Sequence, residues 1–276
     1  MFGAVKNILK QLIAYLTRKL NGPYVQSMIV KTEQGLFVVD QNDLTVGWKL
    51  RRKARFADNE LRWLTARISG ETSVLVVGAH VGSLAVPISQ ICKELVAIEA
   101  NPHTFQLLSQ TFLLNNLSNC TPINIAASDK EETISFLLNK LNSGGSKRVP
   151  LFKKRMYYYD QPKEIQVKAY SLDAYLTDLS FDMVIMDIEG SEYFALKGMQ
   201  QILSNAKVLA IEFLPHHLKN VSGVSVETFL TVIAPHFSSL FIPSKNLHVK
   251  SDEFLNILSD MYKRNQEEDM ILFSKD

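Results

Sequence analysis

The sequence lacks the features that mark disulfide-rich and strongly basic proteins. Among its 276 residues there are only two cysteines, Cys92 and Cys120, and neither belongs to a CxxC pair. No disulfide framework or zinc knuckle is therefore expected, and this cysteine usage fits a reducing cytoplasm. The net charge is only +2, so nothing in the composition indicates a nucleic-acid partner.

Long apolar runs are also missing near the N-terminus, where Leu12–Leu16 is the longest unbroken one. That run is far shorter than the roughly 20 residues that a membrane span needs. Apolar residues nevertheless recur at helical spacing across residues 1–20, which predicts an amphipathic helix. We expect this helix to pack on the domain or on a second subunit of a homodimer, and the alternative is a basic helix resting on a membrane. Its basic residues are Lys6, Lys10, Arg18 and Lys19.

The chain divides into an N-terminal extension, residues 1–69, and one α/β domain, residues 70–276. After its first helix, the extension is predicted to form a β-hairpin that turns near Thr32–Gly35 and a helix that leads into the core. Residues 142–163 interrupt the alternation of strands and helices in the domain. They begin with a flexible run, and three cations beside three tyrosines follow it. This segment is predicted either to be a lid over a substrate or to be a solvated excursion.

Buried strands and helices alternate along the domain. Val74–Val77 is a strand buried on both faces, and a glycine turn, a short helix and a second strand that ends in Glu99 follow it. This order predicts a doubly wound, mostly parallel sheet with right-handed crossovers. Further strands are expected at Thr121–Ile125, Phe181–Asp187, Val208–Phe213 and Met270–Phe273.

Three features of the predicted strands point to one ligand site. The Gly78–Gly82 turn, Glu99 and Asp187 each stand at the carboxyl end of a strand, where open parallel sheets bind their ligands. Glycines allow a ligand close to the backbone, and a carboxylate after the second strand suits the hydroxyls of a ribose. The glycine spacing differs from the GxGxxG of dinucleotide sites, so an adenosine ligand with a polar, charged tail fits better.

Five stretches of the sequence resemble the FkbM family of S-adenosylmethionine-dependent methyltransferases, within the Rossmann-like class I methyltransferase fold. The resemblance extends over residues 70–215, and its most specific part is the acidic run that leads into Leu-Lys-Gly. The stretches are VGAHVGSLAVPIS (77–89), VAIEANP (96–102), AASDKEE (126–132), SLDAYL (171–176) and MDIEGSEYFALKGM (186–199).

The resemblance implies a seven-stranded sheet whose terminal strand lies antiparallel beside the fifth. It also implies S-adenosylmethionine as the cofactor, with Glu99 on the ribose and Asp187 near the transferred methyl group. One position departs from the pattern, because Val76 stands where such enzymes usually carry an acid. The cofactor-binding residues that it implies are Val77, Gly78, Ala79, His80, Gly82, Ser83, Glu99, Ala100, Asn101, Ala127, Ser128, Asp129 and Asp187.

The family implies methylation of an oxygen, and a hydroxyl of a sugar, a glycan or a related natural product is the expected acceptor. The Lys153–Tyr159 loop is consistent with a saccharide or an anionic acceptor. Removal of the hydroxyl proton is assigned to side chains that follow two core strands. Mg²⁺ held by this cluster is the less favoured alternative, because no ligand spacing demands a metal. The candidates are Asp187, Glu189, Glu212 and one of the adjacent histidines His216 and His217, of which His216 is chosen.

Purely structural roles for two glutamates, and two other classes of function for the protein, stay open. Glu189 could cap the following helix instead of acting in the site, and Glu192 is expected to be a solvated or ion-paired helix residue. The apolar Val76 leaves open a methyltransferase-like fold that has lost catalysis and serves as a binding or scaffold module. A nicotinamide-dependent oxidoreductase is the remaining alternative.

Overall fold

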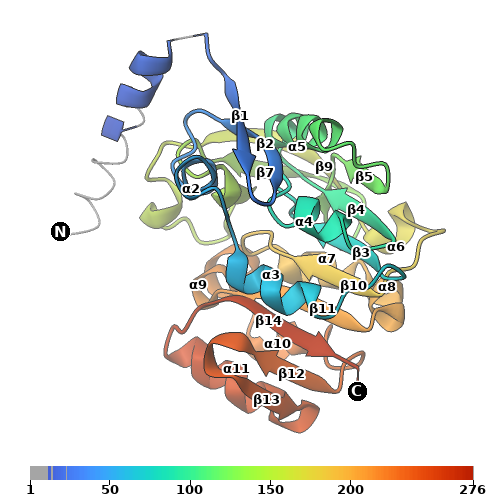
Figure 1. The fold of residues 1–276 in the computed structure, drawn as a ribbon. Helices are drawn as coiled ribbons and strands as arrows, with labels where there is room; N and C mark the ends of the chain where they lie inside the picture. The colour runs from blue at the N-terminus through green and yellow to red at the C-terminus, as the bar shows by residue number, and fades with distance from the viewer. Residues whose placement is uncertain (1–11, 14, 23, 276) are drawn as a thin grey trace.

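The computed structural model describes residues 12–13, 15–22 and 24–275, and Figure 1 shows their arrangement. The strands of these residues form a hairpin, an eight-stranded sheet and a four-stranded sheet. The large sheet has the strand order β13-β12-β14-β11-β10-β3-β4-β5. Its strands are β3 (Ser73–Val77), β4 (Glu94–Ile98), β5 (Cys120–Ile123), β10 (Met183–Met186), β11 (Val208–Phe213), β12 (Ser239–Ile242), β13 (Leu247–Lys250) and β14 (Glu268–Ser274).

The central strands are parallel because helices connect them, and each is buried on both faces. Along β3, Leu75 and Val77 belong to one apolar core while Val74 and Val76 belong to the other. This alternation follows from the period of two in a strand, and it explains why the sequence is apolar without interruption. The doubly wound α/β fold is therefore confirmed.

Helices cover both faces of the sheet. The first core packs against helices from the C-terminal half of the chain, and the second core against helices from the N-terminal half. The helices are α2 (Val46–Lys53), α3 (Asp58–Thr65), α4 (Ala85–Ser89), α5 (Pro102–Leu114), α6 (Leu172–Tyr175), α7 (Glu192–Lys197), α8 (Gln200–Asn205), α9 (Pro215–His217), α10 (Val226–Leu230) and α11 (Phe254–Lys263). Short 3₁₀ or π turns are η1 (Ser143–Gly145), η2 (Arg155–Tyr157), η3 (Leu218–Ser222), η4 (Pro243–Lys245) and η5 (Ser251–Glu253).

The terminal strand β14 lies antiparallel beside β11, as expected. The expected count of seven strands was one too low, because β13 pairs antiparallel with β12 at the edge. A tight turn makes this hairpin, since η4 ends at Asn246 in the left-handed region, with φ of 46°. Asparagine tolerates that conformation better than most residues, and the sequence alone gave no strong strand signal at Leu247–Lys250.

The second sheet has the order β6-β9-β7-β8 and its own small apolar core. It contains the strand β8, which lies inside the segment 142–163, so this segment is built partly into the fold. The short strand β6, which follows β5 along the chain, pairs parallel with β9. The strands are β6 (Ala126–Ala127), β7 (Glu132–Leu138), β8 (Lys147–Arg148) and β9 (Lys163–Tyr170).

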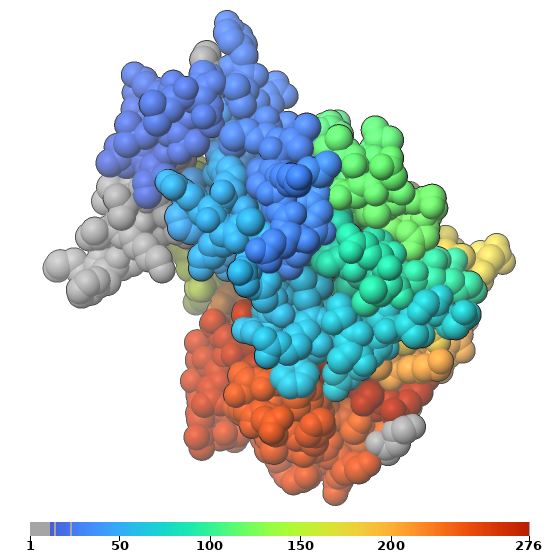
Figure 2. Space-filling view, in the orientation of Figure 1, coloured from blue at the N-terminus to red at the C-terminus, as the bar shows by residue number. Residues whose placement is uncertain are grey.

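The hairpin of β1 (Ser27–Thr32) and β2 (Gly35–Asp40) turns where the sequence predicted, with Thr32 opposite Gly35. Its strand β2 lies on α5, where the Val38 amide donates to the Thr111 hydroxyl at 3.0 Å. The described part of the N-terminal helix, residues 12–13 and 15–21, projects beyond the hairpin at one end of the molecule (Figures 1 and 2). Tyr15 and Arg18 line a cavity together with Asp40 and Asn42 of the body. The apolar side chains of the helix are exposed, unlike those of a helix packed on its apolar face: Leu12, Ile13, Leu16 and Leu20.

The first eleven residues, where most of the predicted helix lies, are outside the described residues. Among the helices of the residues that the structure describes, none has both the length and the apolar character needed to cross a membrane.

Candidate active site

A glycine brings the ends of two central strands together. Gly78 follows β3 with φ of 89°, a region that glycine enters without strain. A Cβ atom at this position would lie 1.9 Å from the carbonyl oxygen of Asp187, at the end of the neighbouring strand β10. The close approach therefore requires glycine, and it places Asp187 beside the turn as the sequence predicted.

The turn also holds the carboxylate that follows β4. The amides of Gly78 and Ala79 both donate to the Ile98 carbonyl at 2.9 Å. The next amide, that of His80, donates to Oε2 of Glu99 at 2.8 Å, and the amide of Asn101 donates to Oε1 at 2.8 Å. Each carboxylate oxygen has a second lone pair, so Glu99 has acceptor capacity left for the two hydroxyls of a ribose.

Burial determines the electrostatics of Glu99. Desolvation raises the pKa of its carboxyl from 4.5 to about 7, and the two amide hydrogen bonds lower the pKa and limit this rise. A carboxyl group with this pKa changes its charge near neutral pH, so the binding of a ligand to Glu99 depends on pH.

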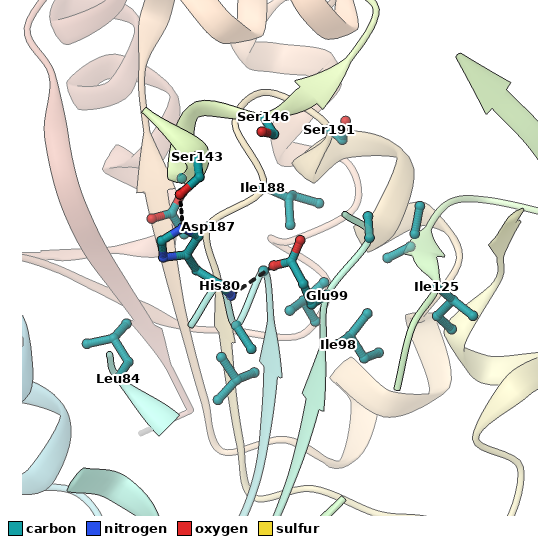
Figure 3. Close-up of a pocket in the computed structure, with 18 of the residues that line it drawn as sticks. His80, Leu84, Ile98, Glu99, Ile125, Ser143, Ser146, Asp187, Ile188 and Ser191 are labelled. Atoms are coloured by element: carbon teal, nitrogen blue, oxygen red, sulfur yellow. Dashed lines mark hydrogen bonds between the residues drawn. The ribbon is translucent and has the colours of Figure 1, made fainter. Parts of the chain in front are cut away.

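A cavity with an empty volume of about 930 Å³ opens between the glycine turn and the second sheet. Figure 3 shows Glu99, Asp187 and Ser191 around it. One wall is apolar and suits a planar aromatic ring; it consists of Ile98, Ile125, Ala127, Ile134 and Phe136. The predicted residues that line the cavity are Val77, Gly78, Ala79, His80, Ser83, Glu99, Ala100, Ala127 and Asp187. Val76 also lines it, so this part of the wall carries no acid.

Four predicted residues have other roles and lie outside the cavity lining. The Asn101 side chain accepts from the amides of His103 and Thr104 and so caps α5. Gly82 packs under Leu108, and a Cβ atom there would lie 3.1 Å from that side chain. The other two make polar pairs within the fold: the Ser128 hydroxyl donates to Glu132, and Asp129 lies 3.0 Å from Lys197.

His80 connects the turn to two segments that the sequence did not associate with it. Its Nε2 lies 2.7 Å from the Ser143 hydroxyl, and this hydroxyl donates to Asp43. Figure 3 shows the contact of His80 with Ser143 at the mouth of the cavity. Burial lowers the pKa of His80, so the ring is neutral at physiological pH. The N-terminal extension, the segment 142–163 and the glycine turn are thereby joined.

A second cavity, with an empty volume of about 1450 Å³, also borders Asp187. Helix α2 and its continuation contribute three cations to it, Lys49, Lys53 and Arg55. The two cavities share Asp187 together with a few small and apolar residues. Six carboxylates also line this cavity: Asp58, which lies 3.5 Å from Arg55, and Glu60 near the cations, and Asp187, Glu189, Glu212 and Asp269 from the core of the domain.

A buried lysine is the counter-ion of this acidic wall. Lys147 comes from β8, and its Nζ lies 2.6 Å from Oε2 of Glu189 and 3.1 Å from Nε2 of His217. Enclosure by the protein and the neighbouring Glu189 raise the pKa of Asp187 well above its ordinary value, although its side chain still meets solvent in the cavities. Burial and Asp187 likewise raise the pKa of Glu212 well above the ordinary range. Lys147 opposes both shifts.

The two adjacent histidines have different surroundings. His216, the predicted candidate, has its Nδ1 3.1 Å from the Tyr157 hydroxyl and its Nε2 3.4 Å from Glu267. His217 lies in the acidic cluster instead, with Nε2 3.3 Å from Glu189 and Nδ1 3.7 Å from Glu212. Burial and Lys147 lower the pKa of His217 strongly, so this ring is neutral. The structure thus brings Asp187, Glu189 and Glu212 together with His217, and not with His216.

Neither glutamate of the IEGSE run has the helix role that was considered for it from the sequence. Glu192 is buried, and its carboxylate accepts from the amides of Ile188 and Gly190 at 3.1 Å each, so it is neither solvated nor ion-paired. Glu189 has φ of 57° and pairs with Lys147 in place of capping a helix. Within the described residues, no group of three or more His, Cys, Asp or Glu side chains is arranged to hold a metal ion.

Sequence reasoning missed Lys147, Tyr157, Ser143 and Asp43 as members of this region. Lys147 and Ser143 stand in a Gly- and Ser-rich run, where a cation is normally solvated and a hydroxyl carries no spacing signal. Their burial depends on β8 joining the second sheet at Leu137, a contact across ten residues that no local periodicity shows.

Comparison with known proteins gives one family over more than half of the chain. Residues 77–249 match the family described as the methyltransferase FkbM domain. No significant match is found among curated proteins.

Solved structures of methyltransferases share low sequence identity with the chain. A methyltransferase FkbM from Methylobacillus flagellatus KT is 18% identical, with a TM-score of 0.46, over 79% of this chain and 48% of that one. A tRNA methyltransferase from M. jannaschii is 18% identical, with a TM-score of 0.38, over 68% of this chain and 44% of that one. An rRNA methylase from Streptococcus thermophilus is 12% identical, with a TM-score of 0.45, over 78% of this chain and 93% of that one. The chain spans about half the length of the first two.

Proposed function

This chain belongs to the methyltransferase FkbM domain family, and we propose that it transfers a methyl group from S-adenosylmethionine to a hydroxyl of a sugar, a glycan or a related natural product. One observation carries the proposal: Asp187 borders two cavities, one suited to an adenosine ligand and one lined by polar and charged side chains. A methyl group at this position has its donor on one side and an acceptor on the other.

Several residues that line the first cavity support binding of the cofactor. S-adenosylmethionine supplies a methyl group that is already activated on a sulfonium. In this proposal Glu99 accepts hydrogen bonds from the ribose hydroxyls, and the apolar wall of Ile98, Ala127 and Phe136 holds the adenine. Gly78 lets the polar tail approach the backbone beside Asp187.

The second cavity supports a polyhydroxylated acceptor. Carboxylates accept hydrogen bonds from the adjacent hydroxyls of a sugar, and Asp187, Glu189 and Glu212 line one wall. The opposite wall, with Lys49 and Lys53, suits an acceptor that also carries an anionic group. Asp187, on the acidic wall, also lines the cofactor cavity, so an acceptor hydroxyl beside Asp187 can reach the methyl group.

Asp187 is the residue placed to take the proton of the acceptor hydroxyl. Its raised pKa makes it a stronger base than an ordinary carboxylate. Lys147 opposes that rise in pKa and so favours the ionised form of Asp187, which can accept the proton. Glu189, held by Lys147 and His217, orients the acceptor from the other side.

Transfer of labelled methyl groups tests the function directly. The full chain is incubated with labelled S-adenosylmethionine and separate panels of nucleotide sugars, lipid-linked sugars and polysaccharides. We expect label on one class of hydroxyl acceptor, and loss of the label with Glu99→Ala. Calorimetry with S-adenosylhomocysteine gives the binding part of the proposal, for which Glu99→Ala should weaken affinity about 100-fold because two charge-assisted hydrogen bonds are lost.

The competing functions give different results in the same experiments. Cofactor binding without transfer to any acceptor, which the missing acid at Val76 makes worth testing, would indicate a binding or scaffold protein. Micromolar binding of NADH, without binding of S-adenosylhomocysteine, would indicate an oxidoreductase and refute the proposal.

The location and the partners of the protein belong to the same proposal. The cysteine usage supports a cytoplasmic enzyme. The exposed apolar face of the N-terminal helix supports contact with a second subunit or with a membrane surface.

A further inference from the structure

A loop of six residues projects apolar and basic side chains into solvent. Residues 151–156, called the basic–apolar loop below, are all exposed. Leu151, Phe152 and Met156 are exposed by 64%, 55% and 51%. The three residues between them are Lys153, Lys154 and Arg155, and among the described residues none of these cations lies in a salt bridge.

The loop is anchored to the body at both ends. At one end the Phe152 amide donates to the Asn220 carbonyl at 3.0 Å, and Leu151 lies beside Gly223, where a Cβ atom would be 2.8 Å from its Cδ1. At the other end Tyr157 is buried, and its hydroxyl donates to the His216 carbonyl at 3.0 Å. Asp160 then accepts from two backbone amides of the segment before β8. Leu151 and Phe152 touch the body there, yet each stays more than half exposed.

We propose that the basic–apolar loop binds an anionic lipid surface. A block of cations flanked by large apolar residues suits a segment at the membrane interface: the apolar groups enter the boundary with the acyl chains, and the cations meet phosphates. Phe152 is the one exposed residue of this loop with an aromatic face on which a nucleic-acid base could stack, whereas Leu151 and Met156 have none. A loop of this length is also too small to form a stable protein interface by itself.

The N-terminal helix offers a second patch of the same character. Its exposed apolar residues, such as Leu12 and Leu16, accompany the exposed Arg18 and Lys19. In Figure 1 the yellow-green segment that carries the loop and the blue N-terminal helix both lie at the left of the body. Two such patches strengthen binding to one surface more than either does alone.

The position of the loop also indicates what kind of molecule carries the acceptor hydroxyl. Tyr157, which ends the loop, has Lys147 over its ring at 5.2 Å, so the lipid-binding residues adjoin the acidic cluster of the second cavity. If the proposed methyl transfer holds, on which this step rests, the acceptor hydroxyl belongs to a sugar carried on a membrane lipid. The binding of the loop to lipid does not depend on that step.

Sedimentation with vesicles tests the binding. The full chain is spun with vesicles of phosphatidylcholine alone and with vesicles that contain phosphatidylglycerol. We expect binding to the anionic vesicles only, and a loss of about 100-fold for Lys153→Gln/Lys154→Gln/Arg155→Gln, since each cation near the surface contributes about fivefold. The matched control, Lys93→Gln/Lys168→Gln/Lys263→Gln, removes three exposed cations elsewhere and should bind as the wild type does.

A fluorescence measurement tests insertion and uses a folded variant. Phe152→Trp should gain quenching by brominated lipids in the anionic vesicles, whereas Leu113→Trp, at an exposed position of α5, should not. Both variants should bind S-adenosylhomocysteine as the wild type does, because neither position lines the cofactor cavity. A failure of methyl transfer would therefore leave the vesicle result standing.

Three outcomes would overturn the proposal. The first is equal sedimentation of the triple variant and the wild type. The second is an absence of quenching for Phe152→Trp in vesicles to which the protein binds. The third is loss of binding to RNA, rather than to vesicles, in the triple variant, which would assign the loop to nucleic acid.

Discussion

The ammonium group of Lys147 lies 2.6 Å from the carboxylate of Glu189 and joins a strand of the second sheet to the acidic wall of the candidate active site. Both side chains are largely buried. Removal of one partner from such a pair is costly, because the other charge stays buried without compensation. Through this ion pair, the segment 142–163 influences the carboxyl groups of the acidic wall that could take a proton.

Lys147→Gln should shift the pH dependence of methyl transfer. Lys147 lowers the pKa of Asp187 and of Glu212, so its loss raises both. The base must be ionised to act, so the acidic limb of the kcat profile should move to higher pH. Lys168→Gln, which removes an exposed cation from β9, is the control and should leave the profile unchanged. If kcat instead fell equally at every pH, with no shift of its pH profile, Lys147 would have a structural role only.

Glu99 should make the cofactor-free protein less stable as the pH rises. Its pKa in the folded protein is about 7 against 4.5 unfolded, so the folded state holds the proton more tightly. The contribution of Glu99 to the free energy of unfolding is fully present below pH 4.5. About 3 kcal/mol of this free energy is lost as the pH rises through 7. Urea unfolding between pH 4.5 and 8 measures this slope. Glu99→Gln should flatten it, and an unchanged slope in that variant would assign the effect to other groups.

Gly78→Ala should prevent a stable fold or cost at least about 4 kcal/mol of unfolding free energy. The new methyl group would lie 1.9 Å from the Asp187 carbonyl, and φ of 89° is strained for alanine. Gly70→Ala is the matched control, because no atom lies within 4 Å of the Cβ added there. Thermal unfolding of the two variants gives the comparison. A Gly78→Ala protein as stable as the control would mean that the two strand ends lie further apart.

Ser143→Ala should weaken cofactor binding about fivefold and lower the unfolding free energy by about 1 kcal/mol. The hydroxyl joins His80 to Asp43, and His80 carries the amide that holds Glu99. Ser204→Ala removes an exposed hydroxyl that bonds only to a nearby carbonyl, and it serves as the control. Calorimetry with S-adenosylhomocysteine measures the affinity. If both variants bind alike, the contact between Ser143 and His80 does not position the site.

Local patterns predicted the central part of the fold and of the cofactor cavity. The apolar run Val74–Val77 could only be a strand covered on both sides, and glycine at position 78 marked the turn. Glu99 and Asp187 each follow a buried strand, so their convergence followed from the rule that parallel strands end at one edge. These inferences held because periodicity and chain order determine which residues reach that edge.

The sequence by itself determined the doubly wound sheet, its glycine turn and the two carboxylates beside it, since each depends on contacts within one repeating unit. Only the tertiary structure decided that Lys147 is buried, that His217 rather than His216 meets Glu189, and that Ser143 reaches His80. Those contacts join segments from 28 to 70 residues apart. They arise from the way β8 and α9 pack at the edge of the cavities, and a charge or a hydroxyl in a polar run carries no local sign of its partner.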